Sequence, residues 1–214
     1  MTRNGKFSRR QALQAGAAGM AALLGLGPLS GETLAELRRL TQDESMTGAR
    51  LAGILQAERA EWNALLARVS IERMEEPGAV GVWSVKELIA HLTWYERAVV
   101  ESAARVLQGE RFARPADQGE MAGLNIDERN ARITAQARAR SAGDILADAD
   151  DVFQRRLAMI ATVPDYILND ASALGLPDDI PPWMRVANNS YAHYREHARD
   201  LSAWLQGALT SAIK

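Results

Sequence analysis

The sequence lacks several features that would define a protein class at once. It contains no cysteine, which excludes disulfides, thiolate metal sites and a cysteine nucleophile, and which leaves the redox compartment open. Its net charge of −2 gives no basic field, so we expect no nucleic-acid partner. Histidine is scarce, with three residues in a chain of 214. The position of each histidine is therefore informative.

Strand patterns and long apolar runs are missing as well. We find no alternating apolar segments joined by hairpin turns, and the apolar segment 15–27 is too short to cross a bilayer. Hydrophobic residues nevertheless make up 47% of the chain, which is enough for a sizeable core. We therefore expect an all-α protein with no stable membrane span.

Apolar residues recur with helical period in four long segments. The second of these begins with Ser84 and Glu87, which are spaced as a capping box. Helices with one apolar stripe each must bury those stripes together, which favours a four-helix bundle over residues 47–207. The predicted helices span about 47–70, 84–109, 141–164 and 183–206, with a short helix at 125–139 and long loops at 109–124 and 165–182.

The three histidines all lie on faces that must point into this bundle. His193 and His197 share a face of the fourth helix with Asp200 and Trp204, at about 100° per residue. His91 lies beside Tyr95 on the edge of the buried stripe of the second helix. We therefore expect all three imidazoles to meet inside the bundle or at its mouth.

Two imidazoles at i and i+4 can bind one ion, because their Cβ atoms are about 5–6 Å apart and each nitrogen lies about 2.0–2.1 Å from a bound zinc. His91 is the remaining imidazole, and three protein ligands with an open position are typical of a catalytic metal site. Asp200 is the local candidate to orient His197. Tyr95 is a candidate pocket residue, either as a hydrogen-bond donor to a substrate or as a core tyrosine anchored by its hydroxyl.

Two other interpretations of the histidines remain. Buried neutral histidines can simply be satisfied by hydrogen bonds. Residues 193–197 also read H-x-x-E-H, the inverted zinc-protease motif, in which Glu196 would be the general base. That motif needs a further acidic ligand well downstream, and Asp200 is the sole acid after His197. The protease interpretation is therefore disfavoured.

The first thirty residues have the composition of an export signal. Basic residues including Arg9 and Arg10 precede a short apolar run, and no acidic residue occurs before Glu32. Residues 8–13, SRRQAL, resemble the twin-arginine motif S/T-R-R-x-F-L, with Ala12 in place of phenylalanine. We expect residues 1–30 to direct export to the periplasm or cell exterior. The alternative is a loose tail before a start at Met46, with a cytoplasmic protein.

Two motifs are similar to those of the DinB-like superfamily. Residues 81–92, GVWSVKELIAHL, resemble its G-x-W-S-x-x-[ED]-x-[LI]-x-H-[LI] signature, whose histidine is a metal ligand. Residues 193–204, HYREHARDLSAW, resemble its last helix, which supplies two more ligands, and residues 127–131 resemble its middle segment. The resemblance covers about 47–206.

This resemblance implies an up-down-down-up bundle that binds a divalent ion, zinc or nickel, through His91, His193 and His197. Members include metal-dependent hydrolases, thiol-dependent S-transferases and isomerases, and many are dimers, so a homodimer is compatible with it. The ClbS/DfsB branch lacks the full set of histidines. Because an exported protein would not meet the cytosolic thiol pool, we expect a hydrolase acting on a small-molecule substrate. The alternatives are a thiol-dependent transferase or isomerase and a non-catalytic bundle that sequesters a small molecule.

Overall fold

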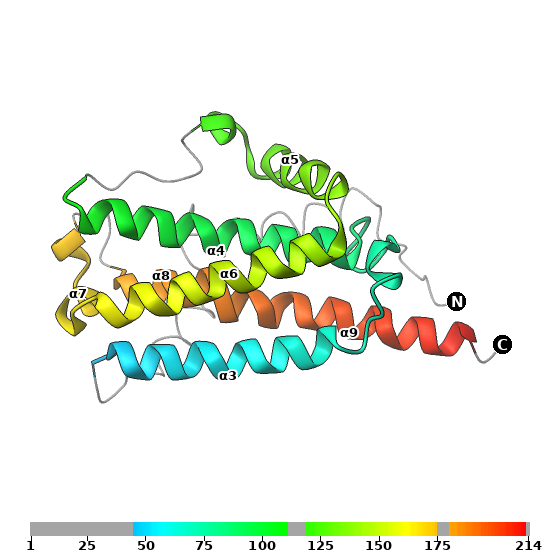
Figure 1. Cartoon of the computed structure of the whole chain (residues 1–214), viewed down its shortest axis with the longest axis horizontal. Helices are drawn as coiled ribbons and strands as arrows, with labels where there is room; N and C mark the ends of the chain where they lie inside the picture. Colours follow the sequence, from blue (N-terminus) through cyan, green and yellow to red (C-terminus); the bar gives the residue numbers. More distant parts are fainter. Residues whose placement is uncertain (1–44, 111–118, 175–179, 213–214) are drawn as a thin grey trace, which may run out of the picture.

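The protein is described by a computed structural model over residues 45–110, 119–174 and 180–212 (Figure 1). The predicted export signal at 1–30 lies outside these residues. Within them the chain forms helices and no strands, which confirms the all-α prediction. The four long helices are α3 (Gly48–Leu66), α4 (Val85–Leu107), α6 (Ala142–Thr162) and α9 (His193–Ala212).

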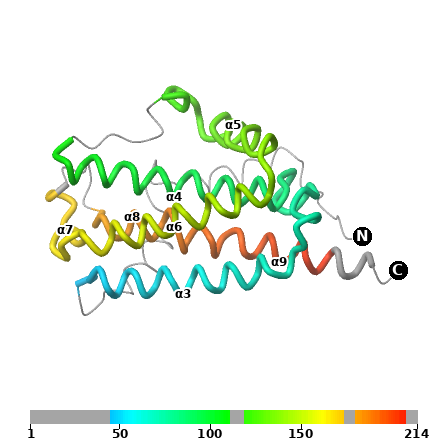
Figure 2. Tube along the Cα trace, in the orientation of Figure 1, coloured from blue at the N-terminus to red at the C-terminus, as the bar shows by residue number. Residues whose placement is uncertain are grey.

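These four helices form an up-down-down-up bundle, as the sequence indicated. Figure 1 shows α3 and α9 running in one direction and α4 and α6 in the other. Because α4 and α6 are parallel neighbours, the chain must return along the length of the bundle after α4 ends and before α6 begins. The crossover contains α5 (Ile126–Arg138), which packs against α4 on the outside of the bundle (Figure 2).

The helix starts follow local sequence signals. Ser84 and Glu87 form the predicted capping box, in which the Ser84 hydroxyl accepts from Glu87 N (3.2 Å) and Ser84 N donates to a Glu87 carboxylate oxygen (2.7 Å). Asn125 forms a second capping box at the start of α5, and Ser141 caps α6. Such caps satisfy backbone donors that have no partner within the helix.

Two segments differ from the expected pattern. The predicted loop 165–182 contains a short helix, α7 (Asp165–Asn169), and a 3₁₀ turn, η4 (Ala171–Leu174). The predicted fourth helix begins as α8 (Pro182–Ala187) and continues into α9 through the π-helical turn η5 (Asn188–Ala192). Hydrophobic period alone did not reveal this turn, because a period counted at a uniform 100° per residue assumes a regular α-helix.

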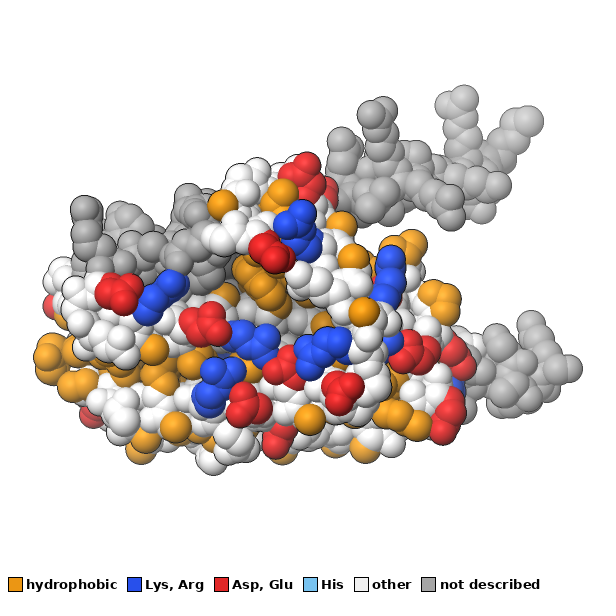
Figure 3. All heavy atoms as spheres, turned by 45° about the horizontal axis from the view of Figure 1, so that its top comes forward, with side chains coloured by type: hydrophobic (Ala, Val, Ile, Leu, Met, Phe, Trp, Pro, Cys, Tyr) orange, Lys and Arg blue, Asp and Glu red, His pale blue; other side chains and the backbone are white. Residues whose placement is uncertain are grey.

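The surface carries charges of both signs. Acidic and basic side chains are interspersed on the face shown in Figure 3. Asp148 of α6 forms an ion pair with Arg97 of α4. It forms a second ion pair, at 2.7 Å, with Arg140, which lies in the turn before α6. Within the described residues, no helix is long and apolar enough to cross a membrane.

The bundle core contains a cluster of three ionisable side chains and one tyrosine, and each long helix contributes one of the four residues. Tyr194 of α9 donates to a Glu96 carboxylate oxygen on α4 and accepts from Arg59 Nη1 on α3 (2.9 Å). Arg156 of α6 lies 2.5 Å from the other oxygen of Glu96, and both of these side chains are 1% exposed. Burial alone would lower the pKa of Arg156, but Glu96 and Tyr194 raise it above its usual value, so Arg156 keeps its charge.

Removing one charge from this cluster tests its importance. We expect Glu96→Gln to lower the free energy of unfolding by about 3–5 kcal/mol, because Arg156 would be left buried without its counter-charge. The measurement is urea unfolding beside the matched control Glu101→Gln, which removes an exposed carboxylate from the same helix. Equal midpoints for the two variants would contradict this account.

Candidate metal centre

The structure brings His91, His193 and His197 together between α4 and α9. One ring nitrogen from each lies within 4.8 Å of those of the other two. The Nε2 atoms of His91 and His193 are 3.1 Å apart, and the ring centroids of His193 and His197 are 5.0 Å apart. The three side chains are 0–2% exposed. The inward convergence expected from the sequence is therefore present, and all three imidazoles lie inside the bundle.

The pairing of two antiparallel helices positions these side chains. Glu96 lies five residues after His91 on α4, and Tyr194 directly follows His193 on α9. The hydrogen bond from Tyr194 to Glu96 therefore joins α9 to α4 near the point where His91 and His193 meet. The π-helical turn η5 ends immediately before His193, at the kind of position where such turns often accompany functional sites.

Burial keeps two of the histidines neutral. It lowers the pKa of His91 well below the ordinary value of 6.5, and the nearby His197 lowers it further, while the neighbouring Asn130 side chain has a smaller, opposite effect. Burial likewise lowers the pKa of His193, helped by His91 and His197. A neutral imidazole is the form that binds a metal ion. The site thus holds His91 and His193 in the ligating form at neutral pH.

The unpaired nitrogens of the cluster fit a metal ion. Among the described residues, buried ring nitrogens without a hydrogen-bond partner include Nδ1 of His91 and of His193 and both nitrogens of His197. Buried polar atoms are otherwise nearly always paired. The Nε2 atoms of His91 and His193, which face each other at 3.1 Å, have about the separation of two ligating nitrogens in a tetrahedral zinc site, roughly 3.3 Å. The donor set therefore suits one divalent ion.

Asn130 of α5 joins this centre although the sequence analysis did not select it as a site residue. Its Oδ1 accepts from the Tyr95 hydroxyl (3.0 Å), its side chain is buried, and its amide nitrogen has no hydrogen-bond partner. The Tyr95 ring packs edge-on against His91, with centroids 4.9 Å apart. The sequence signal that could have identified Asn130 is its position one turn before the apolar Ile133, which places it on the inner face of α5.

The two predicted pocket residues lie next to the histidines. Burial raises the pKa of Tyr95 to about 12, although Arg129 opposes the shift, so its hydroxyl stays protonated and donates to Asn130. Asp200 lies one turn beyond His197, with its carboxylate 3.4 Å from His197 Nδ1 and its side chain half-exposed. Trp83, which was not predicted, covers the other side of His91 with ring centroids 4.9 Å apart.

The fold and the site together define a class of protein: a four-helix bundle that buries three convergent histidines. The sequence matches the DinB superfamily over residues 54–199, and the chain therefore belongs to this superfamily. No curated protein sequence matches the chain.

Solved structures share this fold at low sequence identity. An uncharacterised protein from Escherichia coli UTI89 is 16% identical, with a TM-score of 0.63 over 78% of this chain and 98% of its own. A protein from Streptococcus pneumoniae is 11% identical, with a TM-score of 0.64 over 75% and 91%. The colibactin self-resistance protein ClbS, in complex with a dsDNA, is 16% identical, with a TM-score of 0.60 over 75% and 95%.

The ClbS complex overturns one expectation. We expected no nucleic-acid partner because the chain has no basic excess, but a protein of this fold is found in complex with dsDNA. The reason is that net charge averages over the whole chain, whereas contacts to phosphates depend on the local arrangement of basic side chains. The exclusion of nucleic acid was therefore wrong.

The position of Asn130 leads to a test of its role. We expect Asn130→Ala to weaken binding of Zn²⁺ by about 10–100-fold, because His91 would lose the neighbour that orients its ring. Competition with a chelating dye measures this affinity. Gln136→Ala, an exposed change on the same helix, should bind Zn²⁺ like the wild type. An unchanged affinity in Asn130→Ala would show that Asn130 does not position His91.

Proposed function

We propose that this protein is a metal-dependent hydrolase that acts on a small molecule. The observation that carries the proposal is the convergence of three buried imidazoles from two helices, four of whose six ring nitrogens have no hydrogen-bond partner among the described residues. His91 would bind the ion from α4, and His193 and His197 would bind it from α9. Three neutral nitrogen ligands suit several divalent ions, and we propose zinc or nickel.

The ion would supply Lewis acidity, polarising a substrate carbonyl or phosphoryl oxygen or activating a water molecule. The protein's own residues prepare this chemistry. Asn130 and Tyr95 support His91 from one side, and Trp83 covers it from the other. The Asp200 carboxylate lies 3.4 Å from Nδ1 of His197, and a hydrogen bond between them would leave Nε2 for the ion. We propose that Asp200 orients His197 in this way.

Elemental analysis of the purified protein tests the metal centre. We expect about one divalent ion per chain in the wild type and in Arg199→Ala, which alters an exposed side chain of α9, and substoichiometric metal in His193→Ala. Circular dichroism would verify that all three proteins are folded. A wild-type protein purified without any stoichiometric divalent ion, and unable to take one up, would refute the metal centre.

The reaction type is tested separately with the metal-loaded protein. A screen of esters, amides and phosphoesters should show turnover that chelation and His193→Ala both abolish. Turnover that requires an added low-molecular-weight thiol would instead identify a transferase or isomerase. Tight ligand binding that survives chelation, without turnover, would identify a sequestration bundle.

We further propose that residues 1–30 direct export through a twin-arginine pathway. Arg9 and Arg10 carry this proposal, together with the apolar run that follows them. We expect the wild-type protein in the periplasm or outside the cell and Arg9→Lys/Arg10→Lys in the cytoplasm, as measured by fractionation. Cytoplasmic retention of both proteins would contradict export.

A further inference from the structure

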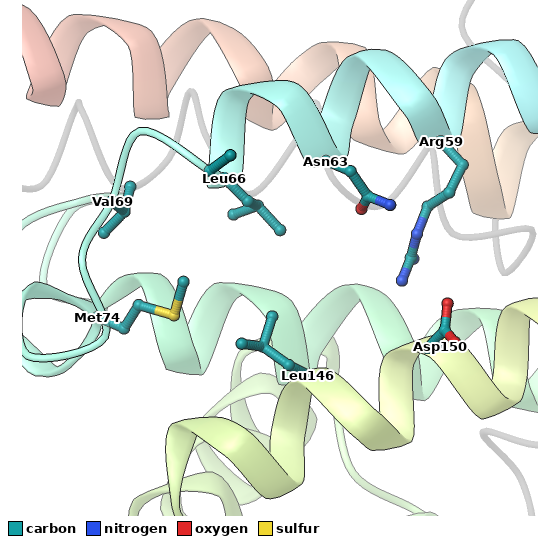
Figure 4. Close-up of a pocket in the computed structure, with 8 residues that line it drawn as sticks. Arg59, Asn63, Leu66, Val69, Met74, Leu146 and Asp150 are labelled. Atoms are coloured by element: carbon teal, nitrogen blue, oxygen red, sulfur yellow. The ribbon is translucent and has the colours of Figure 1, made fainter.

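A groove between α3 and α6 has the features of a second binding site. Its volume is about 330 Å³, which lies at the small end of the range for ligand pockets. Its apolar wall consists of Leu66, Val69, Met74 and Leu146 (Figure 4). The candidate metal centre is built by α4 and α9, so this groove lies on other elements of the bundle.

Polar side chains gather at one end of the groove. Figure 4 shows Arg59 and Asn63 extending from α3 toward α6, where Asp150 extends toward them. Arg59 is 8% exposed and its Nε is buried without a hydrogen-bond partner. The guanidinium is fixed by other contacts, because Nη1 donates to Tyr194 (2.9 Å) and the group lies 5.1 Å from the centre of the Phe153 ring.

Among the described residues, no carboxylate forms an ion pair with Arg59. The buried cluster holds two cations, Arg59 and Arg156, and one anion, Glu96. Both oxygens of Glu96 are engaged, one by Tyr194 and the other by Arg156. Asp150 faces Arg59 across the groove, yet no ion pair joins these two described residues. Because a buried charge without a partner is costly, an anion entering the groove would be stabilised there.

We propose that the groove binds a small amphipathic carboxylic acid. Its carboxylate pairs with the Arg59 guanidinium, which presents donors in a planar fork suited to carboxylates. The Asn63 amide is placed to donate a further hydrogen bond, and the hydrocarbon part packs against the apolar wall. A monoanion is favoured over a phosphate dianion, because Asp150 repels the additional charge at the mouth of the groove.

Calorimetric titration of the full chain with octanoate tests the proposal, with 1-octanol as the uncharged comparison. We expect octanoate to bind and octanol to bind at least tenfold more weakly. Arg59→Met should weaken octanoate binding by about 10- to 100-fold, the effect of a lost charged hydrogen bond. Asp150→Asn should strengthen it by about two- to fivefold by removing a like charge.

Two controls locate the bound octanoate. Asp151→Asn removes the neighbouring acid on α6, which does not line the groove, and should leave the affinity unchanged. Chelation should also leave it unchanged, whereas binding lost on chelation would mean that the carboxylate binds the metal centre and would overturn the proposal. Equal affinities for octanoate and octanol would overturn it too.

A third variant covers the case in which Arg59→Met does not fold. Leu146→Trp fills the groove at its partly exposed apolar wall, and it should abolish octanoate binding while the wild-type melting temperature is retained. A folded Leu146→Trp protein that binds octanoate like the wild type would contradict the groove as the site.

Discussion

The hydrogen bond from Tyr194 to Glu96 is the contact on which the rest of the structure depends. It joins α9 to α4 in the centre of the bundle, and Arg59 of α3 and Arg156 of α6 complete the cluster from the other two helices. Apolar packing alone tolerates sliding of one helix along another, whereas a buried charged group has few positions in which it is satisfied. We infer that this cluster sets the register of the bundle. His91 lies five residues before Glu96, and His193 directly precedes Tyr194, so the two histidines meet as a consequence.

The same arrangement explains the electrostatic character of both candidate sites. At the histidine centre, burial lowers the pKa of His91 and His193, which keeps them neutral and able to bind a cation. At the groove, the cluster has one more cation than it has anions, and Arg59, which lines the groove, carries the excess. The interior of the bundle is thus suited to a divalent cation, and the groove between α3 and α6 to a carboxylate. The two sites are connected through Tyr194, which contacts Arg59 and directly follows His193.

Much of the fold could be predicted from the sequence, because helical period, the Ser84 capping box and the inward faces of the histidines are local properties. What could not be predicted depends on contacts between distant segments. Arg59, Glu96 and Arg156 read as ordinary charged residues of amphipathic helices until the bundle places them together. Asn130 enters the site only because α5 packs against α4, and a uniform helical period cannot reveal the π-helical turn η5. The expectation about nucleic acid was wrong because it was drawn from net charge, which contains no information about the arrangement of charges.

The central claim is that three imidazoles from two antiparallel helices bind one ion. X-ray absorption spectroscopy of the zinc-loaded full chain at the zinc edge tests it most directly. The account predicts scattering from three imidazole nitrogens at about 2.0–2.1 Å, with one imidazole lost in His91→Ala. A zinc ion coordinated by oxygen ligands alone, or a spectrum that is the same in wild type and His91→Ala, would contradict it.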